Sequence, residues 1–80
     1  MRYLIESPHT PEECLQHQDE VLARGPEDLA VYDWGCMAGD HTAWAVIEVS
    51  DRVTAEDRIP PFLRHKARVV ELNKFTPEHV

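Results

Sequence analysis

The stretch HTAWAVIEVS, residues 41–50, has the clearest periodicity in the chain and decides the fold. Its odd positions from 43 to 49 are all apolar, whereas its even positions mix polar side chains with Trp44 and Val46. This alternation predicts a strand, because successive side chains of a strand point to opposite faces of the sheet. One face of the strand therefore belongs to a core, and the other is too apolar to be left in water.

Three more strands are expected, over residues 2–7, 29–37 and 68–75, where β-branched and aromatic residues are frequent. Residues 38–40, Ala-Gly-Asp, form a short hairpin loop between the second strand and residues 41–50. The closing residues TPEHV are expected to be a tail.

The first helix is expected to begin at Thr10, because Glu13 stands three residues later and completes a capping box. Gly25-Pro26 is expected to end it. The apolar spacing predicts an inner face made of Cys14, Leu15, Gln18, Val21 and Leu22. A second helix is expected to open at Thr54, to break at Ile59-Pro60-Pro61 and to resume over residues 61–66.

These elements follow one another as β-α-β-β-α-β, which predicts a ferredoxin-like α+β fold. Right-handed connections would then give one antiparallel sheet in the order 4-1-3-2, with both helices on one face. Eighty residues are enough for a single domain, residues 1–80. The uncovered face, with Trp44 and Val46, predicts a homodimer in which a second copy packs sheet against sheet.

The net charge of −7 excludes the usual nucleic-acid and anionic-membrane partners, which require clustered Lys and Arg. No apolar run approaches the length of a membrane span, and the N-terminal MRYLIES does not resemble a signal peptide. We therefore expect a cytoplasmic protein whose two cysteines are thiols or metal ligands in preference to a disulfide.

The stretch WGCMAGDH, residues 34–41, places a thiol and an imidazole on either side of the expected hairpin loop. In the expected fold, both ends of this hairpin share one end of the domain with the segment after the first strand and the start of the first helix. Imidazole and thiolate are the ligands that zinc, nickel and copper favour. We therefore expect a transition-metal site, nickel or zinc, with His9, Cys36 and His41 as ligands and His65 or Cys14 as a fourth.

Each of these residues also has an ordinary structural interpretation. Free cysteine is usually a small buried apolar residue, and a histidine near a helix C-terminus, such as His65, is favourable to the helix dipole. A Cys–His pair can also be a nucleophile and its base.

The whole chain resembles the dimeric α/β-barrel superfamily of short ferredoxin-like domains. YLIES, the mid-chain Trp-Gly, AWAVIEVSD and VVELNKFTPE are similar to small uncharacterised bacterial families of this length, one group of which is described as nickel-binding. The superfamily also contains monooxygenases and an isomerase. The resemblance thus implies a homodimer with an internal cavity.

Three functions remain open from the sequence. The first is a homodimer that binds a transition metal or small ligand at the end of its sheet. The second is a cofactor-free monooxygenase or isomerase acting in the dimer cavity, with His9, His41 or Glu48 as proton acceptor. The third is a structural or regulatory dimer without a site.

Overall fold

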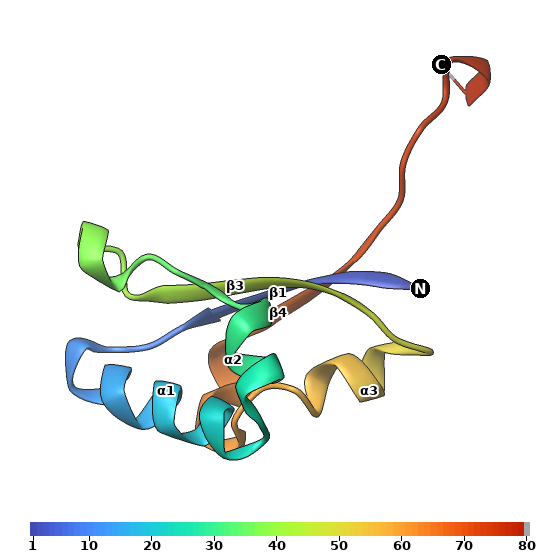
Figure 1. The fold of residues 1–80 in the computed structure, drawn as a ribbon. Helices are drawn as coiled ribbons and strands as arrows, with labels where there is room; N and C mark the ends of the chain where they lie inside the picture. Colours follow the sequence, from blue (N-terminus) through green and yellow to red (C-terminus); the bar gives the residue numbers. More distant parts are fainter. Residues whose placement is uncertain (80) are drawn as a thin grey trace.

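A computed structural model describes residues 1–79 of the chain (Figure 1). Its strands are β1 (Arg2–Pro8), β2 (Asp33–Trp34), β3 (Thr42–Glu48) and β4 (Arg68–Leu72). They form one sheet in the order β2-β3-β1-β4, and every neighbouring pair is antiparallel. The strand expected from the alternation of residues 41–50 is confirmed as β3.

The helical elements within residues 1–79 are all short. The α-helices are α1 (Cys14–Ala23), α2 (Pro26–Val31) and α3 (Arg52–Glu56). The 3₁₀ segments are η1 (Pro11–Glu13), η2 (Cys36–Ala38), η3 (Pro61–Lys66) and η4 (Pro77–His79). Figure 1 shows α1, α2 and α3 on one side of the sheet.

The core lies between this helical layer and the inner face of the sheet. Strand β1 buries Tyr3 and Ile5, and β3 buries Ala45 and Ile47, which follows the alternation seen in the sequence. The helical side contributes Val21, Tyr32, Ala55, Ile59 and Leu63. The small alanines of β3 allow the helical layer to approach the sheet closely.

The ferredoxin-like β-α-β-β-α-β prediction, with its dimeric α/β barrel, is wrong. Neither connection contains one long crossover helix, and the strand expected over residues 29–37 is reduced to the two residues of β2. The sheet order is 2-3-1-4 written from the β2 edge. The predicted order 4-1-3-2 names the same neighbours from the other edge, so the error lies in the helical layer and in β2.

The second strand is short because Gly25-Pro26, which follows α1, also begins a further helix, α2. Gly25 has φ 135°, and Pro26 is the first residue of α2, where its fixed φ suits a helix. Glu27 and Asp28 in the first turn favour the same helix through its dipole. Part of the expected strand therefore forms α2.

Two other helix predictions need correction. The buried positions of α1 are His17 and Val21, while Leu15 and Leu22 are 68% and 48% exposed, so the helix is rotated from its expected orientation. Helix α3 begins after Asp51, whose carboxylate accepts a hydrogen bond from the Thr54 backbone N–H at 2.8 Å. The capping box of Thr10 and Glu13 is confirmed, although it opens η1, one turn before α1.

No helix covers the outer face of the sheet within residues 1–79 (Figure 1). Val46 is 46% exposed there, and its cross-strand neighbour Leu4 is half-buried. Residues 73–79 leave β4 on this side as an extended tail, in which Phe75 is 80% exposed. None of the helices in this part of the chain has the length and apolar character needed to cross a membrane.

Candidate metal centre

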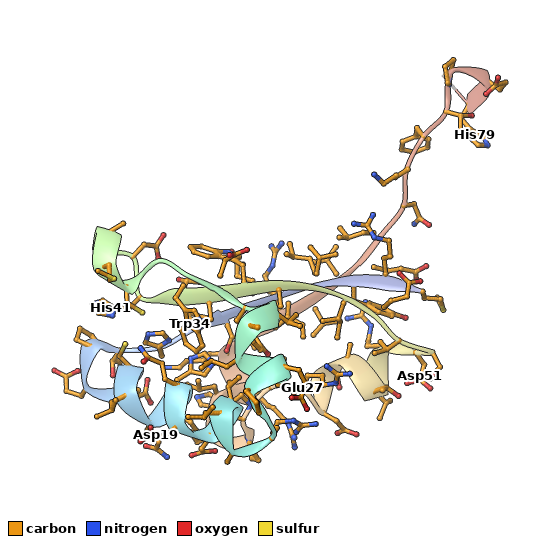
Figure 2. The ribbon with its side chains drawn as sticks, viewed as in Figure 1. Asp19, Glu27, Trp34, His41, Asp51 and His79 are labelled. Atoms are coloured by element: carbon orange, nitrogen blue, oxygen red, sulfur yellow. The ribbon has the colours of Figure 1, made fainter. Side chains whose placement is uncertain are left out.

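Four side chains from distant parts of the chain meet at one end of the sheet. They are His9 after β1, Cys14 at the start of α1, Cys36 at the start of η2 and His41 before β3. One ligand atom from each lies within 4.8 Å of the others. This His/Cys cluster could hold a metal ion. In Figure 2, His41 marks the end of the molecule where the cluster lies, and Trp34 reaches from β2 towards α1.

The pairing of β1 with β3 brings the two histidines together. Pro8 is the register partner of Thr42, and one step further the His9 backbone N–H donates to the His41 carbonyl at 2.9 Å. The capping box at Thr10 then turns the chain into η1, which places Cys14 beside the end of the sheet. The position of the first helix relative to the first strand thus follows from a local sequence signal.

The turn that carries Cys36 depends on a glycine. The Gly35 N–H donates to the Thr42 carbonyl at 2.9 Å, which closes the connection from β2 to β3. A Cβ at Gly35 would lie 2.6 Å from the Asp40 carbonyl oxygen and 2.9 Å from the Trp44 ring. No other residue fits without a shift of the backbone, so the Trp-Gly-Cys sequence is what allows Cys36 to face the cluster.

A continuous series of contacts joins the cluster to its surroundings. The Gln18 amide donates to Cys14 Sγ at 3.3 Å, and the Cys14 thiol donates to Cys36 Sγ at 3.3 Å. Cys36 Sγ lies 3.2 Å from His9 Nε2, and His9 Nδ1 lies 2.8 Å from Nδ1 of His17. A metal bound by His9 Nε2 requires that nitrogen to be free of its proton. The proton then sits on Nδ1 and is donated to His17.

Burial sets the protonation of these groups. It lowers the pKa of His9, with the charge of His41 as the next cause, and it lowers the pKa of His17 to about 4. The pKa of the Cys36 thiol is raised to about 11, chiefly by burial and secondly by its hydrogen bond with Cys14. At neutral pH the His9 imidazole is therefore uncharged and able to bind a metal, whereas Cys36 would have to lose its proton to act as a ligand.

Sequence reasoning missed His17. It was not among the expected ligands, but it is fully buried and stacks edge-on against His9 and Trp34, with ring centroids 4.8 Å apart in each case. The spacing of the sequence could have indicated that His17 lies near the cluster, because position 17 lies three residues after Cys14 and shares its helix face. An apolar stripe does not reveal such a residue, since histidine counts as polar.

His65 does not join the cluster. It is exposed in η3, whereas the next residue, Lys66, forms a salt bridge with Glu13 at 2.7 Å. Of the five residues expected as ligands, the structure therefore brings together His9, Cys14, Cys36 and His41. The proton acceptor considered for an enzyme, Glu48, lies at the opposite end of β3 and pairs with the N-terminal amine at 3.2 Å.

The chemistry of the cluster fits a tetrahedral metal. Zinc–ligand lengths of about 2.0–2.3 Å give tetrahedral edges of about 3.3–3.8 Å between ligand atoms. The Cys14–Cys36 and Cys36–His9 separations, 3.3 and 3.2 Å, are close to this range, and all four ligand atoms lie within 4.8 Å of one another. In addition, His41 Nδ1 is buried with no hydrogen-bond partner among residues 1–79.

A cavity of about 380 Å³ adjoins the cluster and is lined by Gln18, Leu29, Trp34, Cys36 and Met37. It gives small molecules access to Cys36. The arrangement does not favour a catalytic Cys–His ion pair at neutral pH, because the pKa of Cys36 is raised and that of His9 is lowered.

The chain matches no known protein-family model, and neither a curated protein nor a solved structure shows significant similarity to it. The resemblance to the dimeric α/β-barrel superfamily therefore gains no support from these comparisons.

Proposed function

We propose that the protein binds a zinc ion through His9, Cys14, Cys36 and His41. The observation that carries this proposal is the convergence of two thiols and two imidazoles within 4.8 Å from four separate segments of the chain. A Cys₂His₂ set is typical of zinc bound tetrahedrally. Nickel is the second metal to test, since imidazole also suits it.

Four protein ligands leave no open position for a substrate, so the set supports metal binding in preference to metal catalysis. A bound ion would join the end of β1, the start of α1 and the η2 turn. The η2 turn is joined to the end of β1 and to the start of α1 by the contacts of Cys36 with His9 and Cys14, and a small domain gains much of its stability from a metal link of this kind. The metal would thus act as a structural element of this end of the fold.

The test is calorimetric titration of reduced, untagged, metal-free protein with Zn²⁺ and with Ni²⁺. The wild type should bind one Zn²⁺ ion, while His9→Ala and His41→Ala should lose most of the affinity. His65→Ala is the matched control and should bind as the wild type does, because His65 lies outside the cluster. Binding should weaken as the pH falls, since protons compete for the ligands. Wild-type protein that binds no better than the two cluster variants would refute the proposal.

A second copy of the chain is the partner that we propose for the outer face of the sheet. Leu4 is the register partner of both Val46 and Val70, and Trp44 lies next along β3, so apolar side chains cross three strands. The charged residues at the ends of this face are paired within the chain, Arg68 with Glu6 and Glu48 with the N-terminal amine. The unpaired part of the face is therefore its apolar centre, which a second copy could cover.

Light scattering at micromolar concentration tests this dimer. Trp44→Glu places a charge in the interface and should yield a monomer. Val53→Glu is the control, because Val53 is 66% exposed on α3, on the helical side of the sheet. A wild-type mass of 9.2 kDa, that of one chain, would contradict the dimer and leave the metal proposal unaffected.

A further inference from the structure

The two cysteines of the cluster are arranged for a second chemistry, which does not need a metal. Cys14 Sγ and Cys36 Sγ are 3.3 Å apart, although 22 positions separate the residues in the sequence. A disulfide requires about 2.0 Å, so the sulfur atoms need to approach by little more than 1 Å. Both residues begin short helical segments, and the turn of Cys36 ends at Gly39, which has φ 88° and where an added Cβ would meet no atom within 4 Å. The thiols can therefore meet without rearrangement of the sheet.

A small oxidant has access to this pair. Cys36 is half-buried and lines the cavity of about 380 Å³, whose outer wall includes the fully exposed Met37. Cys14, which accepts the hydrogen bond from Gln18, is half-buried too but is not one of the residues that line the cavity. An oxidant in the cavity therefore meets Cys36, with Cys14 Sγ 3.3 Å from its sulfur.

We propose that Cys14 and Cys36 form an intramolecular disulfide on reaction with a peroxide, and that this modification releases the metal. The second half of the inference rests on the proposed zinc site. Oxidation would remove both thiolates and leave only His9 and His41, two ligands where zinc requires four. Reduction of the disulfide would restore the complete set.

The chemistry balances with hydrogen peroxide as the oxidant. Cys36 first loses its proton, and the thiolate sulfur then attacks one peroxide oxygen. The O–O bond breaks, a sulfenic acid forms, and the departing hydroxide takes up the released proton as water. The sulfur of Cys14 then attacks the sulfenic sulfur. The S–O bond breaks, the S–S bond forms, and the second hydroxide leaves as water with the proton of Cys14. Two thiols and one peroxide give one disulfide and two waters.

The first experiment tests the modification on metal-free protein. Reduced wild type is treated with hydrogen peroxide and its intact mass is measured, followed by peptide mapping without reductant. We expect the loss of two hydrogen atoms and a peptide that links Cys14 to Cys36, both reversed by dithiothreitol. Stable sulfinic acid on either cysteine, or disulfides only between chains, would overturn the proposal.

The second experiment tests metal release. Zinc-loaded protein is treated with peroxide while a colorimetric chelator follows free Zn²⁺. The release should parallel disulfide formation and reverse with dithiothreitol. Zinc that stays bound after the disulfide has formed would overturn the proposal that the modification releases the metal.

His41→Ala separates the two proposals. It removes a ligand and leaves both cysteines, so it should bind zinc weakly and still form the disulfide. If the wild type forms the disulfide but never binds zinc, the metal proposal fails and the modification stands. If the wild type binds zinc but does not form the disulfide, the modification fails and the metal proposal stands.

Discussion

Replacement of His17 by glutamine should change how the stability of the protein depends on pH. His17 is fully buried, and its pKa is lowered from 6.5 to about 4 by burial and then by the charge of His9. Its Nε2 has no hydrogen-bond partner among residues 1–79, so a charged His17, with a proton on both ring nitrogens, would leave one N–H without an acceptor. The unfolded chain takes up this proton near pH 6.5, which favours unfolding below that pH.

Proton linkage gives the direction and the size of this pH dependence of stability. The pKa of His17 is lower in the folded protein than in the unfolded chain. The resulting loss in the free energy of unfolding is therefore nearly absent at pH 7, grows as the pH falls below 6.5, and reaches its limit near pH 4. Between pH 7 and pH 5 the two pKa values give a loss of about 2 kcal/mol in the free energy of unfolding. Glutamine keeps a hydrogen-bonding side chain and does not titrate, so His17→Gln should lose about 2 kcal/mol less over the same interval.

Urea denaturation at several pH values, with chelator and reductant present, measures this difference. His65→Gln is the control, because it replaces an exposed histidine outside the cluster and should follow the wild type. If His17→Gln and the wild type lose equal stability between pH 7 and pH 5, the burial and neutral state assigned to His17 are wrong.

Two further substitutions test the turns that build the cluster. Thr10→Ala should lower the free energy of unfolding by about 1 kcal/mol, because the Thr10 hydroxyl accepts from the Glu13 N–H at 3.2 Å in the capping box. An unchanged midpoint in urea denaturation would show that the capping box contributes nothing to stability. Gly35→Ala should cost about 1–3 kcal/mol, since its Cβ would clash with the Asp40 carbonyl and the Trp44 ring. Gly35→Ala should also weaken zinc binding in calorimetry, and full wild-type affinity would mean that the η2 turn does not position Cys36.

Local signals in the sequence determined much of the secondary structure. The alternation of residues 41–50 identified β3 and its buried face, and Thr10 with Glu13 identified where the first helical segment begins. These features depend on neighbours within a few positions, so a single segment contains the information. Gly25-Pro26 shows the limit of such signals, because the same pair ends one helix and begins another.

The location of four of the five expected ligands at one end of the sheet was anticipated from the order of the strands, even though the helical layer was not. That the side chains of His9, Cys36 and His41 point to one place was decided only by the tertiary structure, since a shift of one residue in register reverses every side chain of a strand. The exclusion of His65 and the burial of His17 depend on how η3 and α1 are rotated against the sheet. The rotation of a helix about its axis is set by packing across the whole core. The apolar spacing of the sequence does not predict this rotation when the residue that faces the core is polar, as His17 is.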